Sequence, residues 1–209
     1  MRTSRNLIFA ILVVTVPLVV VSPALAQGTD SGVGVGVLGG FTRTSVVFEN
    51  DVPDALKKSG SGVIFGIWFG GNRDGRVGFM GELDYVIKKA EIEGSEEELH
   101  YLEIPAVFRI NMGSRSRSGA SVYIIAGPVF DIRVKAKEDG EEVDSPEDLY
   151  QGLDIGILGG AGVEFYRIGV EVRHSWGVRS VLQPDVTDFS GLGKTQLNTL
   201  QILGKIRFN

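Results

Sequence analysis

Apolar and polar side chains alternate along the last stretch of the chain, residues 196–209. Ile202 and Phe208 belong to the apolar set, whereas Lys205 and Arg207 belong to the set between them. Side chains that alternate with a period of two point to opposite faces of a β-strand. A strand with one apolar and one charged face is typical of a membrane β-barrel, in which one face contacts lipid and the other faces the lumen. The pattern therefore predicts a barrel strand at the C-terminal end.

The same alternation recurs along the chain and predicts eight strands in all. In each strand, glycines or polar and charged residues alternate with valine, isoleucine, leucine or phenylalanine. The strands reach the roughly 9 to 11 residues that a tilted membrane strand needs. They are predicted at residues 32–42, 61–70, 76–89, 99–111, 120–135, 152–165, 168–178 and 196–209.

The lengths of the connections distinguish a membrane barrel from a soluble sandwich or a lipocalin-like barrel, which would show the same alternation. The connections after even-numbered strands are short: 71–75, 112–119 and 166–167. Those after odd-numbered strands are long: 43–60, 90–98, 136–151 and 179–195. Short periplasmic turns that alternate with longer outer loops are typical of outer-membrane barrels. We therefore predict an all-β fold, an eight-stranded antiparallel up-and-down transmembrane β-barrel of the outer-membrane type.

The polar face of the predicted strands carries acidic and basic side chains in similar number, which is too much charge for a soluble core. An eight-stranded barrel is just wide enough to be filled by its own side chains. Carboxylates are therefore expected to pair with guanidinium and ammonium groups inside the lumen. This predicted lumen charge network is structural and consists of Glu82, Asp84, Glu103, Arg109, Asp131, Arg133, Asp154, Glu164, Glu171, Arg173, Lys205 and Arg207.

Residues 1–26 have the features of a cleaved secretory signal peptide. Two arginines precede an apolar stretch over residues 7–21, and small residues end the segment at Ala26. The apolar stretch is shorter than the roughly 20 residues that span a bilayer as a helix. We expect residues 27–209 to form a single outer-membrane β-barrel domain, an integral protein of the bacterial outer membrane after Sec-type export.

Composition narrows the chemistry that the chain can support. The formal net charge is −5 and becomes −7 without the two signal-peptide arginines, so no nucleic acid partner is expected. Without cysteine, the chain has neither a disulfide nor a thiolate nucleophile or ligand. No loop has the oxygen spacing of a calcium site, and we expect no cofactor and no metal. The acidic runs at 96–98 and 138–148 are interpreted as solvated outer loops.

The histidines give little support for catalysis. His174 belongs to the apolar set of its strand together with Trp176, which favours a place in an interfacial aromatic belt. Ser175 follows His174 directly, and neighbouring residues on a strand point to opposite faces. A lipid-modifying site with a histidine beside a serine is therefore disfavoured, no catalytic residue is assigned, and we expect no enzyme.

Two prolines, Pro105 and Pro128, fall within predicted strands, where a proline cannot donate to the ladder, so bulges or missing pairs are expected there. The segments around them resemble motifs of the PorT-like outer-membrane β-barrel domain family. The resemblance rests on residues 101–105, 126–128, 154–165, 171–173 and 198–208 and extends over the chain from about Gly32. It implies a barrel fold but no particular reaction.

Three functions fit these observations. The leading hypothesis is a small outer-membrane β-barrel protein with a charge-filled lumen and a structural or surface-interaction role, without catalysis. The alternatives are a narrow channel or conduit for small or apolar solutes and a lipid-modifying outer-membrane enzyme. The expected partners are outer-membrane lipid, the barrel assembly machinery during biogenesis, and an extracellular or envelope protein bound through the outer loops.

Overall fold

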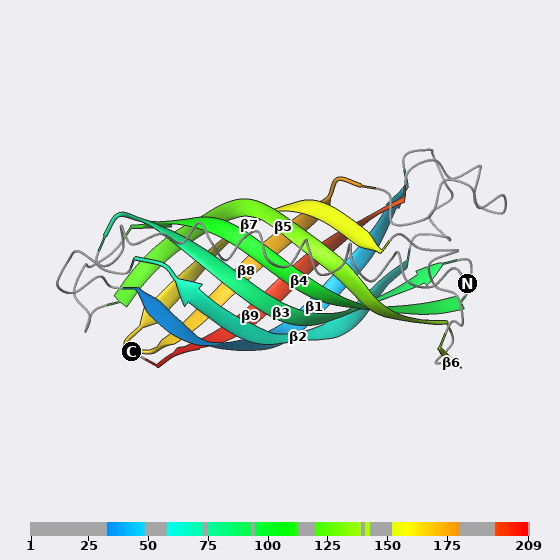
Figure 1. Ribbon diagram of the computed structural model, residues 1–209, viewed down its shortest axis with the longest axis horizontal. Coiled ribbons are helices and arrows are strands. Elements are labelled where there is room, and N and C mark those ends of the chain that lie inside the picture. Colours follow the sequence, from blue (N-terminus) through cyan, green and yellow to red (C-terminus); the bar gives the residue numbers. More distant parts are fainter. Residues whose placement is uncertain are drawn as a thin grey trace, which may run out of the picture. The chain divides into compact units, whose positions relative to one another are not determined.

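Long strands close into an antiparallel barrel in the computed structural model of this chain (Figure 1). The structure describes residues 33–48, 58–72, 75–92, 95–112, 120–138, 141–142, 152–179 and 195–208. The signal-peptide prediction lies outside these residues. The strands are β1 (Gly34–Phe48), β2 (Lys58–Gly70), β3 (Val77–Ile92), β4 (Ser95–Asn111), β5 (Ala120–Glu138), β6 (Glu141–Glu142), β7 (Leu153–Phe165), β8 (Ile168–Gly177) and β9 (Thr195–Arg207).

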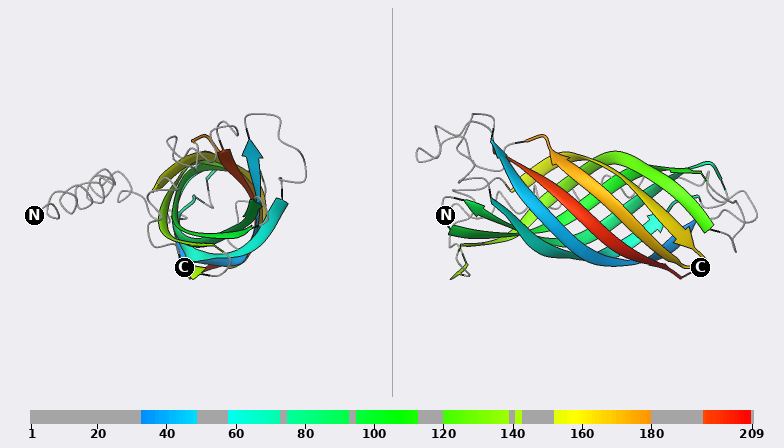
Figure 2. Two further views of the ribbon diagram at one scale, coloured as in Figure 1. Left: turned by 90° about the vertical axis from the view of Figure 1, so that its right-hand side faces the viewer. Right: turned by 180° about the vertical axis from the view of Figure 1, so that it is seen from behind.

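Each barrel strand pairs with its neighbours in the chain, and β1 pairs with β9 to complete the ring (Figure 2). The order around the barrel is β1-β2-β3-β4-β5-β7-β8-β9, and every pairing is antiparallel. The short β6 pairs only with the end of β5 and was not predicted. The eight-stranded antiparallel barrel predicted from the alternation is confirmed. Among the described residues, no helix is both long and apolar enough to cross a membrane.

Large apolar side chains cover the outside of the barrel, whereas most charged side chains of the strands point inward. Phe41 is 73% exposed and Ile202 is 51% exposed, although both lie in the middle of paired strands. Arg173, next to the outward-facing Val172, is only 1% exposed. An apolar outer surface of this extent is suited to lipid rather than to water.

The two prolines interrupt the ladders of β4, as predicted. Between β3 and β4, the register passes from Gly81↔Ala106 to Asp84↔Glu103, and Pro105 keeps a partner only on β5. Between β4 and β5, the pairing is absent at Pro128, which is paired with β7 instead. Each proline therefore removes residue pairs on one side of its strand, because its backbone nitrogen has no hydrogen to donate.

Two predicted outer loops are wrong in extent. In place of the connection over residues 43–60, β1 continues to Phe48 and β2 begins at Lys58. Instead of a connection over residues 90–98, β3 continues to Ile92 and β4 begins at Ser95. Lys89 lies opposite Glu98 in this hairpin, and their side chains form an ion pair of 2.7 Å. Opposite charges on facing positions stabilise a strand pair, so the ladder extends past the apolar part of the wall. The acidic run at 96–98 is therefore strand, and the run at 138–148 lies largely outside the described residues.

Candidate functional site: the charged lumen

Acidic and basic side chains of the lumen come from opposite walls of the barrel. Glu82 and Asp84 lie on β3, whereas Arg173 lies on β8, four strands away around the ring of eight. Likewise, Glu103 on β4 lies four strands from Gln201 on β9, whose amide nitrogen donates to Glu103 Oε1 at 3.2 Å. The interior of an eight-stranded barrel is narrow enough for long side chains to meet across it. Ion pairs between β3 and β8 and a hydrogen bond between β4 and β9 therefore cross the lumen.

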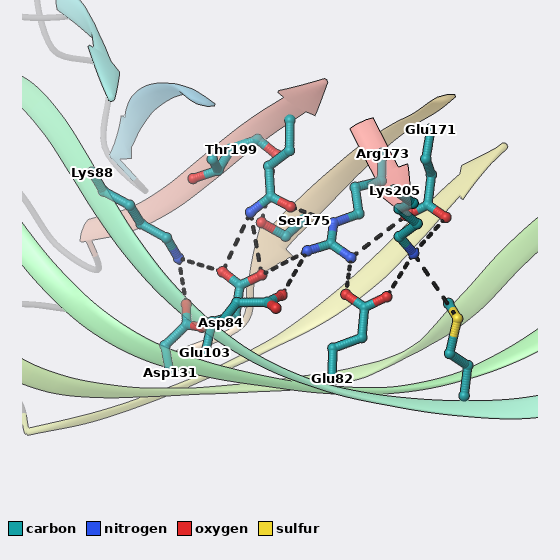
Figure 3. A network of polar contacts seen from close by, with 12 residues as sticks. Glu82, Asp84, Lys88, Glu103, Asp131, Glu171, Arg173, Ser175, Thr199 and Lys205 are labelled. Atoms are coloured by element: carbon teal, nitrogen blue, oxygen red, sulfur yellow. Dashed lines mark hydrogen bonds and ion pairs between the residues drawn. The ribbon is translucent and has the colours of Figure 1, made fainter. Parts of the chain in front are cut away.

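Arg173 is the centre of the network (Figure 3). Its guanidinium donates to Glu82 through Nη1, and its Nη2 lies 3.0 Å from Asp84 Oδ2. The same Nη2 is 3.6 Å from Glu103 Oε1, and Nε donates to Gln201. The side chains of Arg173 and of the three acids are completely buried. One guanidinium thus holds three carboxylates of the opposite wall, a geometry suited to its planar fork of donors.

Lys205 extends the network toward the short-turn end of the barrel. Its Nζ lies 2.7 Å from Glu82 Oε1 and 2.9 Å from Glu171 Oε2. The hydroxyl of Tyr123 donates to the same oxygen of Glu171 at 2.9 Å. Glu82 therefore joins the Arg173 centre to the Lys205 group (Figure 3).

Lys88 extends the network toward the opposite end, where the long connections lie. It forms an ion pair with Asp131 and approaches Glu103 Oε2 at 3.4 Å. Asp154 is paired in register with Asp131, and its Oδ1 accepts the backbone N–H of Ile155 at 2.8 Å. A chain of charged contacts therefore runs along the lumen from Lys88 to Lys205.

A separate group occupies the short-turn end. Glu164 accepts from Arg109 Nη1 at 2.9 Å and from Arg207 Nε at 3.0 Å. The guanidinium of Arg109 lies 3.7 Å from the centre of the Tyr123 ring, and that of Arg207 lies 4.9 Å from the Trp68 ring. Stacking on aromatic faces holds both guanidinium planes while their edges remain available to acceptors.

The structure buries eleven of the twelve residues predicted for the lumen network, and Arg133 is half-buried. Arg133 does not join the central contacts described above. Sequence reasoning left out two buried members, Lys88 and Gln201. The alternation on β3 did indicate that Lys88 faces the lumen, because it lies on the same face as Glu82. Gln201 is uncharged, so a search for charges on the polar face could not find it.

Apolar side chains fill the rest of the lumen. Val107 and Leu158 point into the lumen and are completely buried. The buried apolar cluster consists of Leu38, Ile64, Trp68, Met80, Val86, Val107, Tyr123, Ile125, Val129, Leu158 and Leu203. The lumen is thus occupied by a polar network and an apolar cluster rather than by charges alone.

A polar chain that sequence reasoning missed lies apart from the lumen network, with His100 buried at its centre and Tyr85 and Glu98 half-buried. Tyr85 Oη is 2.7 Å from His100 Nδ1, and His100 Nε2 is 2.7 Å from Glu98 Oε1. Glu98 also forms ion pairs of 2.7 Å with Lys89 and with Lys137. These residues come from β3, β4 and β5, so only the register between the strands brings them together. A search for adjacent histidine and serine could not detect such a group.

His174 lies where the alternation predicted. Its ring packs on Trp176 with the centroids 4.6 Å apart, whereas Ser175 is buried and its Oγ lies 3.5 Å from the carbonyl oxygen of Thr199. The two side chains therefore point to opposite faces. Within the described residues, no group of three or more acidic, histidine or cysteine side chains is placed to hold a metal ion.

Comparisons with known proteins bear on the fold and the family. A family model described as an outer membrane protein beta-barrel domain matches residues 25–183. A comparison with curated protein sequences gave no match. Neisserial surface protein A is similar in structure, with a TM-score of 0.52 and 15% identity over 85% of this chain and 99% of that chain. At this identity the likeness shows the fold alone.

Two other solved structures are similar at lower scores. The attachment invasion locus protein Ail of Yersinia pestis, solved with the heparin analogue sucrose octasulfate, has a TM-score of 0.45 and 14% identity, covering 84% of this chain and 99% of that chain. OprG from Pseudomonas aeruginosa has a TM-score of 0.44 and 12% identity, covering 87% of this chain and 96% of that chain. The matched family model places the barrel in the bacterial outer membrane as an integral protein.

Proposed function

This chain belongs to the family of outer membrane proteins with a β-barrel domain, and from that premise we propose that it is a closed, non-conducting barrel with a structural or surface-interaction role and no catalytic activity. The observation that carries the proposal is the contact of Arg173 with Glu82, Asp84 and Glu103 across the lumen. A pore would need a continuous path of water at this level. The side chains of these four residues are completely buried, which supports a lumen that is closed at this level.

The energetic cost of an unpaired buried charge supports a lumen that stays closed at the Arg173 network. A buried ion pair is costly to form, but removing one partner leaves a charge without compensation. Arg173 cannot swing aside without exposing three carboxylates of the opposite wall. The network therefore behaves as part of the barrel interior rather than as a movable gate.

The finer family assignment is also a proposal. The motifs around Pro105 and Pro128 support a PorT-like barrel, and the ladder interruptions lie at these two residues. The partners proposed with it are outer-membrane lipid along the apolar wall, the assembly machinery during biogenesis, and an envelope or extracellular protein at the outer loops. No nucleic acid is proposed, because the chain has a net charge of −5.

Conductance across planar bilayers tests the closure. The wild-type barrel is expected to show no stable openings, because the network fills the lumen. Arg43→Gln is the control and should likewise show no openings, since Arg43 is exposed on the outer face and its guanidinium donates to Ser59. Stable openings in the wild-type protein would replace this proposal by the channel alternative.

The chain of Tyr85, His100 and Glu98, in which His100 is buried, favours one second candidate, a lipid-modifying enzyme. A hydroxyl, an imidazole and a carboxylate linked in this order are the components of an activated nucleophile. Incubation with labelled lipid A distinguishes this candidate from the leading one. Turnover by the wild type that is lost in His100→Ala and kept in His174→Ala would establish the enzyme, whereas the leading proposal expects no turnover.

A further inference from the structure

A small cavity lies inside the lumen at the short-turn end of the barrel, the end that faces the periplasm in this class of protein. Its volume is about 10 Å³, close to the minimum that one water molecule occupies. Its lining includes Trp68, Arg109, Glu164, Arg167 and Arg207. The cavity therefore has room for one oxygen atom, and most groups around it can donate hydrogen bonds.

Arg109 has a donor that no described residue accepts. Its Nε donates to Asn111 Oδ1 at 2.8 Å and its Nη1 donates to Glu164, but its Nη2 is buried without a hydrogen-bond partner. The residue is 2% exposed and its plane is stacked on Tyr123. An unused donor of a buried guanidinium carries a desolvation cost that an acceptor in the cavity would remove.

The charges around the cavity are unequal. Among its described lining residues, Glu164 is the carboxylate, and it is shared by Arg109 and Arg207. The exposed Arg167 adds a third guanidinium at the turn between β7 and β8. The fourth cation of the lining, Lys205, is paired with acids deeper in the lumen. The short-turn mouth is thus positive before any ligand binds.

The rest of the described lumen has the opposite sign. Three buried cations, Lys88, Arg173 and Lys205, face six buried carboxylates: Glu82, Asp84, Glu103, Asp131, Asp154 and Glu171. An anion attracted to the mouth would meet repulsion and a filled lumen beyond the cavity. The arrangement therefore favours binding at the mouth over passage through the barrel.

We propose that this mouth binds an oxyanion, the phosphate or carboxylate group of a small periplasmic solute. One oxygen of the group occupies the cavity and accepts from Arg109 Nη2. The remainder stays at the opening, where the exposed Arg167 contacts it. Guanidinium groups suit this role because their donors match the oxygens of phosphate and carboxylate.

Tryptophan fluorescence tests the site, because Trp68 lines the cavity and the only other tryptophan, Trp176, is exposed on the apolar outside. In a Trp176→Phe background, Trp68 is the single reporter. The folded barrel in zwitterionic detergent is titrated with inorganic phosphate, and separately with acetate, at an ionic strength held constant with chloride. A saturable change in Trp68 emission is expected with at least one of the two, and the arm that gives it identifies the oxyanion class.

Variants place the response at the cavity. Arg109→Lys keeps the charge but loses the forked donor, and it should weaken apparent affinity about tenfold or more. Arg167→Gln should weaken it about twofold to fivefold, as expected for an exposed charge. Arg43→Gln, on the outer surface, should leave it unchanged. Each variant is first checked for the shift in gel mobility on heating that a closed barrel shows.

Two results would overturn the proposal. The first is a change in Trp68 emission with phosphate and acetate that does not saturate and equals the change that chloride produces. The second is an unchanged affinity in Arg109→Lys. If Arg109→Lys does not fold, the test rests on Arg167→Gln. An apparent oxyanion affinity that is unchanged in Arg167→Gln would then overturn the proposal.

Discussion

Single residues decide whether the crowded lumen can form. Gly162 lies on the lumen face of β7 beside Tyr123, and a Cβ atom added there would lie 2.5 Å from the Tyr123 hydroxyl oxygen. Tyr123 cannot easily give way, because it lies under the Arg109 guanidinium and donates to Glu171. The glycine is thus required by close approach rather than by backbone conformation.

Gly162→Ala is therefore expected to destabilise the barrel by about 1 to 3 kcal/mol through overpacking. The measurement is the free energy of unfolding by urea in detergent or lipid vesicles. Gly152→Ala is the matched control, because no atom of the described residues lies within 4 Å of a Cβ atom placed there. Equal stability of the two variants would mean that Tyr123 has space to move.

The arrangement of the strands around the ring decides which side chains meet across the lumen, and single residues do not reveal this arrangement. The alternation predicted that Glu82 and Arg173 face the lumen, because facing depends only on the local period of two. It could not predict that Arg173 holds Glu82 and Asp84, since that depends on which strands stand opposite in the closed ring. The chain of Tyr85, His100 and Glu98 was missed for the same reason, because register between strands creates it.

Strand extent was also only partly predictable. The wrong loop over residues 90–98 followed from reading a strand as ending where its apolar positions end. The cross-strand pair of Lys89 with Glu98 shows that a ladder can continue on charged residues. The alternation placed Val107 and Leu203 on the lumen face, but it could not predict that they belong to one packed cluster, because that depends on which strands stand opposite in the closed ring.

The contact between β8 and β3 predicts strong coupling between opposite walls. Arg173→Met removes the compensation of four buried acids and should cost about 3 to 5 kcal/mol of unfolding free energy. Glu82→Gln alone should cost less, since Arg173 keeps three other carboxylate partners, Asp84, Glu103 and Glu171. The double variant should be less destabilised than the sum of the two, as a double-mutant cycle measures. Additive losses would contradict the cross-lumen pairing.

Across the whole molecule, side chains that face lipid are apolar, whereas their neighbours that face the lumen are mostly polar or charged. Gln201 and Ile202 are adjacent near the middle of β9, yet the first is completely buried in the polar network and the second is 51% exposed on the apolar wall. In a soluble barrel these environments would be exchanged. The fold is therefore defined by its surroundings as much as by its internal contacts.

Ile202→Arg tests this arrangement. A charge on the lipid face near the middle of a strand costs roughly 2 to 4 kcal/mol in a bilayer, so the variant should insert poorly into lipid vesicles. Ile202→Val, which keeps an apolar surface, should insert like the wild type. Insertion is followed by the fraction of protein whose gel mobility shifts on heating and that resists external protease. Efficient insertion of Ile202→Arg would mean that this wall faces water or another protein rather than lipid, and the outward apolar surface would then need a different occupant.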